Sequence, residues 1–187
     1  MGALAIARFE LVRRARLLST YVYFGVFLAA AGLFTVAAGG GFKGAVVTFG
    51  SSKVFINAPY ALNQTITVLG YVGGLVTAAL MGRAVQQDFE QETFHFFFTT
   101  PISPRQYLAG RFLGAMLALT GIFSSIAIGC AAGLLVPTID QALVGPGRPA
   151  AYVQPYLVSV IPNLLGTGSI FFAMGALGRR MMPVYVV

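Results

Sequence analysis

Residues 112–136 read FLGAMLALTGIFSSIAIGCAAGLLV, an apolar stretch without a single acidic or basic side chain. The hydrocarbon core of a bilayer is about 30 Å thick, and a helix that rises about 1.5 Å per residue crosses it in about 20 residues. Three further apolar segments reach this length, at residues 20–38, 62–81 and 156–178. The sequence therefore predicts an all-α integral membrane protein with four transmembrane helices. Residues 182–187 are expected to begin a fifth.

The composition excludes an ordinary soluble domain. Of the 187 residues 57% are hydrophobic and only 9% are charged, whereas apolar residues make up about 45–50% of a typical soluble domain. The net charge of +7 comes from basic residues at the ends of the apolar segments. Membrane topology accounts for that placement, so we expect no nucleic-acid partner. The single cysteine, Cys130, lies within an apolar segment and is expected to be a small buried side chain.

The basic residues also predict the orientation. One side of the membrane would carry nine of them and the other side three. Because basic residues concentrate in cytoplasmic loops, the amino terminus and residues 83–111 are expected in the cytoplasm of a multi-pass protein. The first group comprises Arg8, Arg13, Arg14, Arg16, Arg83, Arg105, Arg111, Arg179 and Arg180, and the second Lys43, Lys53 and Arg148. The first apolar segment exceeds the usual length of a signal-peptide core and is expected to be retained.

Residues 1–19 are expected to form an amphipathic helix on the membrane surface. Apolar residues recur every three or four positions, and charged residues occupy the remainder of the helix. The apolar face comprises Leu4, Ala7, Leu11, Ala15 and Leu18; the charged residues are Arg8, Glu10, Arg13, Arg14 and Arg16. Ile6, Phe9 and Leu17 interrupt the charged side, which indicates that the helix also packs against protein. The alternative is a basic tail that only sets topology.

Small residues four positions apart predict close helix packing in two segments. Such a stripe lies on one helix face and lets two backbones approach, either within the chain or between two copies. One stripe comprises Gly70, Gly74, Ala78 and Gly82, and the other Gly121, Ser125, Gly129 and Gly133.

The fourth segment contains Pro162 followed by Asn163. Proline lacks a backbone donor and is expected to kink the helix and leave a carbonyl group without its usual partner. The kink would support helix packing or, alternatively, line a substrate path. No apolar segment has a charge at its centre, which argues against a proton-driven pump.

The hydrophilic stretch 83–111, RAVQQDFEQETFHFFFTTPISPRQYLAGR, holds Asp88, Glu90 and Glu92, three of the five acidic residues. A serine, a proline and a glutamine at positions 103, 104 and 106 predict the start of a helix. Residues 86–98 are expected to form a short helix that ends before Pro101. Its carboxylates and its aromatic residues, among them Phe94, would suit a partner with a basic rim and an apolar cleft. The alternative is an acidic stretch that is merely solvated.

Enzyme chemistry is not expected within this chain. It has one histidine, His95, which excludes a two-histidine metal site. It also lacks the glycine-rich G-x-x-x-x-G-K-[ST] loop that holds nucleotide phosphates. We therefore expect no cofactor on this chain and a separate energy source.

Residues 88–95 (DFEQETFH), 99–105 (TTPISPR) and 110–111 (GR) resemble the cytoplasmic signature of ABC-2 type transporter permeases. That signature reads E-x-G-T-x-E, a few apolar residues, S/T-P-[IL]-S-R, and then G-K/R. Glu92 stands here in place of the usual glycine, and His95 in place of the second glutamate. The first change favours a helix, and the second removes a charge that relatives carry.

The resemblance implies the membrane subunit of an ABC exporter in a bacterial inner membrane. Its partners would be an ATP-binding subunit that hydrolyses ATP-Mg, a second permease copy or a homologous permease, and the lipid bilayer. Residues Asp88, Glu90, Glu92 and Phe94 would contact the ATPase through a coupling helix. Arg105 and Arg111 would orient this element against lipid phosphate or the partner.

The resemblance also implies that the chain is an amino-terminal fragment of a six-span unit. Residues 57–60, 110–115 and 179–185 are similar to one bacterial branch, in which some members carry a carboxy-terminal aminopeptidase-like domain of the zinc-dependent M1 type. The alternative function is therefore a membrane anchor that does not transport and that holds such a peptidase or another catalytic domain. A channel is disfavoured because no charged or carbonyl-rich filter is evident.

Overall fold

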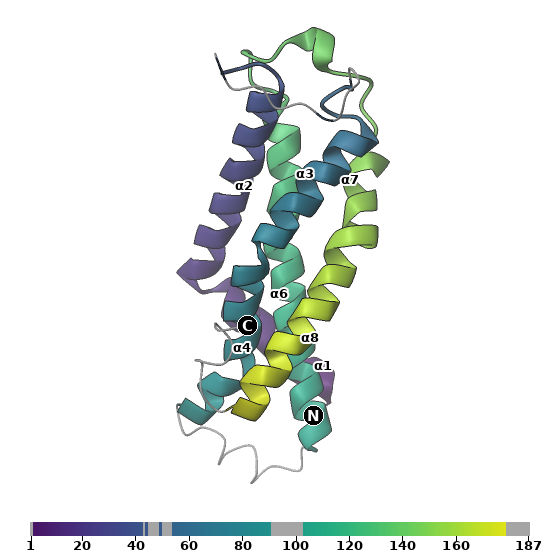
Figure 1. Ribbon diagram of the computed structural model, residues 1–187. Coiled ribbons are helices and arrows are strands. Elements are labelled where there is room, and N and C mark those ends of the chain that lie inside the picture. The colour runs from purple at the N-terminus through teal and green to yellow at the C-terminus, as the bar shows by residue number, and fades with distance from the viewer. Residues whose placement is uncertain (1, 43, 45–48, 50–53, 91–102, 179–187) are drawn as a thin grey trace. The chain divides into compact units, whose positions relative to one another are not determined.

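The computed structural model describes residues 2–42, 44, 49, 54–90 and 103–178, without the side chains of residues 88–90. Every regular element in these ranges is helical (Figure 1). The α-helices are α1 (Ala3–Ala15), α2 (Leu18–Ala38), α3 (Pro59–Val72), α4 (Gly74–Glu90), α6 (Pro104–Gly133), α7 (Ala150–Pro155) and α8 (Ile161–Gly178). A 3-10 turn, η1 (Gln141–Leu143), precedes α7, and a π-helical segment, η2 (Tyr156–Val160), joins α7 to α8.

Three helices of the described chain are long and apolar enough to cross a membrane. They are α2, α6 and the continuous helix Ala150–Leu177, which contains α7, η2 and most of α8. The pair α3 and α4 adds a fourth span if its two bent halves are counted together. The described part of the chain confirms the prediction of an all-helical fold with helices long and apolar enough to cross a membrane. The expected start of a fifth span, at residues 182–187, lies outside the described residues.

The second predicted span is interrupted. Residues 62–81 were expected to form one helix, but α3 ends at Val72 and α4 starts at Gly74, with Gly73 in a turn between them. Adjacent glycines weaken a helix because they lose more backbone freedom than other residues and provide no side chain to pack. The Gly73–Gly74 pair therefore divides this span locally.

The irregularity expected at Pro162 begins earlier in the chain. The π-helical segment Tyr156–Val160 lies between Pro155 and Pro162, and the Ile161 amide donates to the Tyr156 carbonyl. A π-helical segment accommodates backbone groups that a proline would otherwise leave without a partner. The helix thus continues through both prolines as a bulge.

The chain divides into two compact units. Unit one comprises Met1–Thr20, Gly73–Gly121 and Asn163–Val187, and unit two comprises Tyr21–Val72 and Ile122–Pro162. Helix α6 contributes its first part to unit one and its second part to unit two.

In unit two, α2 packs closely against the second part of α6. A Cβ atom at Gly129 would lie 2.4 Å from the Leu28 carbonyl oxygen, and one at Gly133 would lie 2.9 Å from that of Gly32. The Phe27 and Phe123 rings contact each other nearby in a tilted arrangement, with centroids 5.1 Å apart. Helices α3 and α7 lie side by side in the same unit (Figure 1).

In unit one, α4 crosses α8 where both helices carry a glycine. A Cβ atom at Gly175 would lie 2.3 Å from the Gly82 carbonyl oxygen. One helical turn or more away, Gly168 lies beside Met81 and Met116, and the Phe112 and Phe172 rings meet edge to face. These contacts join α8 to α4 and to the first part of α6.

Only some residues of the two small-residue stripes therefore lie at helix contacts. Gly82, Gly129 and Gly133 lie at close helix contacts, and Ala78 and Ser125 are buried. Gly70 makes an ordinary contact with Val160, whereas a Cβ atom at Gly74 or Gly121 would meet nothing within 4 Å. The break at Gly73 separates Gly70 from the rest of the first stripe, so one continuous packing face does not form there.

Candidate functional site

Three of the predicted coupling residues, Asp88, Glu90 and Arg105, lie at the end of α4 and the start of α6. The backbone of Asp88 and Glu90 belongs to the last two turns of α4, which extends to Glu90. Residues 86–90 thus continue α4 and do not begin a separate short helix. Glu92 and Phe94 lie outside the described residues. Arg105 is exposed in the first turn of α6.

The predicted start of α6 is confirmed by a reciprocal pair of hydrogen bonds. The Gln106 amide donates to the Ser103 hydroxyl at 3.3 Å, and the Ser103 amide donates to the Gln106 side-chain oxygen at 3.4 Å. This capping box satisfies backbone donors at the helix start and, with Pro104 in the first helical position, fixes where α6 begins. Helix α6 consequently starts eight residues before the predicted span at residue 112.

A cluster of buried charges joins α1 to the rest of unit one. Glu10 is fully buried, and its carboxylate accepts hydrogen bonds from three arginines. The Arg14 Nε atom lies 2.5 Å from Glu10 Oε1, and Arg13 Nη2 lies 3.2 Å away. Arg111, on α6, donates through Nη1 to the other carboxylate oxygen. We call Glu10, Arg13, Arg14 and Arg111 the Glu10 cluster.

The Glu10 cluster also reaches α4. The Arg14 Nη2 atom donates to the Leu80 carbonyl oxygen at 3.0 Å, and Arg14 is only 3% exposed. Glu10 and Arg14 therefore tie the amino-terminal helix to both α4 and α6. These are the two helices that end and begin beside residues 91–102, the centre of the predicted coupling segment.

The charges in this cluster depend on one another. Burial raises the pKa of Glu10, but the positive charges of Arg14, Arg111 and Arg13 outweigh burial and hold that pKa below its ordinary value. Burial lowers the pKa of Arg14, and the Glu10 carboxylate partly offsets that effect. Glu10 is therefore ionised at neutral pH, and a guanidinium group remains charged there. Removal of Glu10 would take away the negative charge that compensates the buried Arg14 and Arg111.

Two glycines on α6 allow α1 to approach it. A Cβ atom at Gly110 would lie 2.7 Å from the Ala3 carbonyl oxygen, and one at Gly114 would lie 2.7 Å from that of Ala7. Glycines four positions apart create a shallow groove along one helix face. Arg111 follows the first of these glycines directly, so the close approach places its guanidinium group within reach of Glu10.

The side of α1 that is buried within the chain differs from the apolar face that the sequence pattern predicts. Its buried side comprises Ala7, Glu10 and Arg14, whereas Leu4 is 80% and Leu18 78% exposed within the chain. Of the residues that predicted protein contact, Ile6 lies against Gly110, but Phe9 and Leu17 are exposed.

Glu10 was predicted only as one of the charged residues on the surface of the amino-terminal helix, whereas it is buried. Two features of the sequence could have indicated this ion pair. Glu10 and Arg14 are four residues apart on one helix face, and Arg111 lies between two glycines four residues apart, Gly110 and Gly114. The orientation of Arg111 toward lipid phosphate or a partner is also corrected, because this side chain is 3% exposed and pairs with Glu10.

The proposed substrate-path residues are placed at the start of α8. Pro162 is exposed and Asn163 is half-buried. The Asn163 carbonyl oxygen accepts a hydrogen bond from the Thr167 hydroxyl at 2.6 Å. This hydrogen bond lies within α8.

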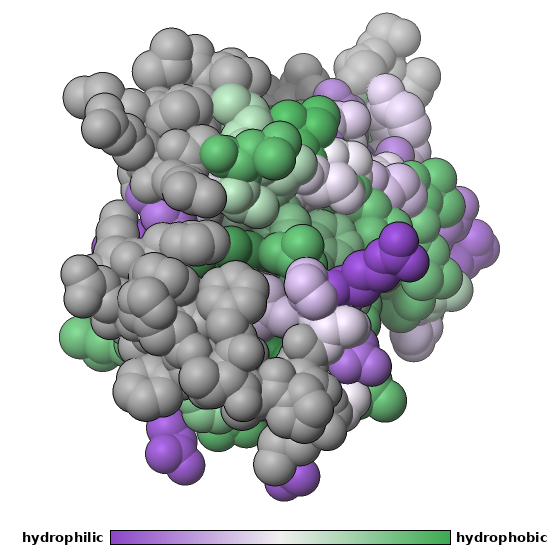
Figure 2. All heavy atoms as spheres, turned by 90° about the horizontal axis from the view of Figure 1, so that it is seen from below, coloured by the Kyte–Doolittle hydropathy of each residue, from purple (hydrophilic) through white to green (hydrophobic). Residues whose placement is uncertain are grey.

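Figure 2 shows one end of the molecule, seen from below the view of Figure 1. On its described part, hydrophilic residues are scattered among hydrophobic ones and do not form one continuous hydrophilic patch. Among the residues that the structure describes, no three His, Cys, Asp or Glu side chains are placed to hold a metal ion.

Comparison of the chain with protein-family models, with curated proteins and with solved structures found no match. The resemblance to ABC-2 permeases therefore stays a prediction from the sequence.

Proposed function

We propose that this chain is the membrane-spanning permease subunit of an ATP-driven exporter, in the manner of the ABC-2 permeases that its motif resembles. A separate subunit would bind and hydrolyse ATP-Mg, and a second copy or a homologous permease would complete the membrane part. The chain would lie in a bacterial inner membrane with its amino terminus in the cytoplasm. Helix α1 would lie at the membrane surface there.

The observation that carries this proposal is the Glu10 cluster. A coupling segment can act only if force applied to it moves the spans and is not lost in local bending. Glu10 and Arg14 join α1 to α4 and α6, the two helices that flank residues 91–102. Because separating a buried ion pair is costly, the three helix ends would move together when an ATPase displaces the segment.

The residues have distinct roles in this proposal. Asp88, Glu90, Glu92 and Phe94 would contact the ATPase, and the exposed Arg105 would contact either the ATPase or lipid phosphate. The buried Glu10 and Arg111 would position the element and would not touch the partner. The contact residues should therefore affect coupling alone, whereas the buried pair should also affect stability.

The first test is copurification of the chain from its native membrane. A stoichiometric ATP-binding subunit supports the permease. A catalytic domain in place of an ATPase supports the alternative, a membrane anchor that does not transport.

The second test is charge reversal in the reconstituted complex. We expect Glu90→Lys and Glu92→Lys to abolish the effect of the membrane subunit on ATP hydrolysis, and transport once a substrate is known, while membrane insertion stays normal. Asp140→Lys is the matched control, because Asp140 is an exposed acidic residue in the loop between α6 and α7. Unchanged coupling in both glutamate variants would contradict the proposal.

A further inference from the structure

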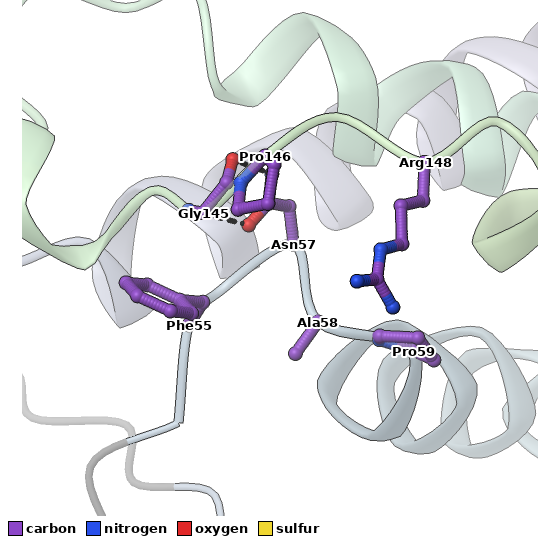
Figure 3. A pocket seen from close by; sticks show the side chains of 7 residues that line it. All are labelled: Phe55, Asn57, Ala58, Pro59, Gly145, Pro146 and Arg148. Atoms are coloured by element: carbon purple, nitrogen blue, oxygen red, sulfur yellow. Dashed lines mark hydrogen bonds between the residues drawn. The ribbon is translucent and has the colours of Figure 1, made fainter.

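A small cavity lies at the loop end of unit two, where the connection between α2 and α3 meets the connection between α6 and α7. Its volume is about 180 Å³. In Figure 3 the Arg148 guanidinium points toward Pro59, and the Phe55 ring lies at the opposite end, beside Gly145. The lining residues are Phe55, Asn57, Ala58, Pro59, Gly145, Pro146 and Arg148.

The walls of this cavity are held in place before any ligand binds. Asn57 is 5% exposed, donates to the Gly145 carbonyl oxygen at 2.6 Å and accepts from the Gly145 amide at 2.8 Å. The Ile56 amide donates to the Leu143 carbonyl oxygen at 3.0 Å. These three bonds fix the two loops against each other. Because both polar atoms of the Asn57 amide are engaged by Gly145, this residue belongs to the framework of the cavity.

Gly145 is required for the same framework. A Cβ atom at this position would lie 2.8 Å from the Phe55 ring. The aromatic wall therefore packs directly on the backbone of the opposite loop. Beneath it, Val36, Ile56, Ala61 and Ile139 form a buried apolar cluster that supports both loops.

Arg148 is the charged residue in the lining of the cavity, which therefore carries a positive charge. Arg148 is exposed, and it forms no ion pair with any residue that the structure describes. Of the five acidic residues in the chain, only Asp140 belongs to unit two, and its side chain accepts from the Ala142 amide at 2.9 Å. The first turn of α3, which starts at Pro59, contains no acidic residue. The cavity thus combines one cationic group with apolar and aromatic walls.

We propose that this cavity binds an oxyanion, phosphate or carboxylate, carried on an apolar body. The Arg148 guanidinium pairs with the oxyanion, for which its planar fork of donors is suited. The apolar body lies against Phe55, Pro59 and Pro146. Two sources share this chemistry, the headgroup of an anionic phospholipid and a soluble amphipathic carboxylate. The site does not depend on the proposed permease function, because every residue in it belongs to unit two.

The test uses the full chain in a neutral detergent. The chain contains no tryptophan, so Phe55→Trp introduces a single fluorescent reporter at the cavity, at a position that is 50% exposed. The probes are dihexanoyl phosphatidylglycerol and octanoate, with dihexanoyl phosphatidylcholine as the zwitterionic control. We expect a saturable change in fluorescence with at least one of the two anions.

Arg148→Gln in the reporter background should weaken anion binding at least about tenfold, the effect of losing one charge-assisted hydrogen bond. The matched control is Arg16→Gln, which removes an exposed arginine from unit one and should leave binding unchanged. Native mass spectrometry of the chain with Phe55 intact, with and without Arg148→Gln, repeats the comparison without the tryptophan.

The probes distinguish the two sources. A response to phosphatidylglycerol alone assigns the site to a phospholipid headgroup, and a response to octanoate alone assigns it to a soluble anion. The proposal is overturned by equal binding of phosphatidylcholine, by equal binding in the Arg148 and Arg16 variants, or by no saturable binding in either measurement.

Discussion

The Glu10 carboxylate on α1 accepts a hydrogen bond from the Arg111 guanidinium on α6, 101 residues away in the sequence, and both side chains are buried. Arg14 donates to the same carboxylate and also to the Leu80 carbonyl oxygen on α4. A single acidic residue thus gathers three helices. Because these positive charges meet on one carboxylate, the loss of Glu10 would remove the negative charge that compensates the buried Arg14 and Arg111.

Replacement of Glu10 by glutamine should destabilise the chain by about 3–5 kcal/mol, the usual effect of removing one member of a buried ion pair. Unfolding can be followed in detergent with a thiol-reactive dye, because Cys130 is the only cysteine and is 1% exposed. Arg16→Gln is the control, since Arg16 is exposed beside the same helix, and a surface substitution changes stability by about 0.5 kcal/mol or less. Equal losses in the two variants would contradict the assigned role of Glu10.

The Glu10 cluster also predicts a dependence of stability on acid. The arginines hold the pKa of Glu10 below its ordinary value of 4.5, so the ionised carboxylate stabilises the folded state above that value. This contribution should disappear as the pH falls through the depressed pKa of the folded state. Thermal unfolding measured from neutral pH downward should show it in the natural chain and lack it in Glu10→Gln. Parallel curves for the two proteins would exclude Glu10 as the source.

Two glycines on α6 should respond oppositely to the same substitution. Gly129→Ala would bring a Cβ atom to 2.4 Å from the Leu28 carbonyl oxygen and 2.9 Å from the Ala31 Cβ atom. Overpacking of this kind costs about 1–3 kcal/mol. A Cβ atom at Gly121 would meet nothing within 4 Å, so Gly121→Ala should leave stability unchanged or raise it by up to about 1 kcal/mol. The dye assay measures both, and a greater loss at Gly121 would show that the contact with α2 is misplaced.

Asn57 should be needed to hold the two loops of unit two together. Asn57→Ala removes both hydrogen bonds with Gly145 and leaves the part-buried Gly145 carbonyl and amide without these partners, at a cost of about 1–3 kcal/mol. Asn63→Ala is the control, because Asn63 is an exposed asparagine on α3. The midpoint of thermal unfolding should fall for the first variant only. An equal midpoint in both would mean that the loops are held by other contacts.

Local features of the fold were predictable because their causes lie within a few neighbouring residues. The start of α6 follows from Ser103, Pro104 and Gln106, which act on the backbone of one helical turn. The break at Gly73 has an equally local cause, but the run 62–81 reads as continuously apolar and conceals it. Hydrophobicity reports the length of a span and does not report whether its helix is continuous.

The sequence by itself determined that the chain is helical and apolar enough to enter a membrane, because the length of an uncharged segment is a one-dimensional property. Tertiary structure alone decided that Glu10 is buried, since a charge enters the interior only where partners from other helices compensate it. It also decided that Gly129 is a contact and Gly121 is not, although both belong to one stripe. Spacing places residues on a common face, but only a neighbouring helix makes that face an interface.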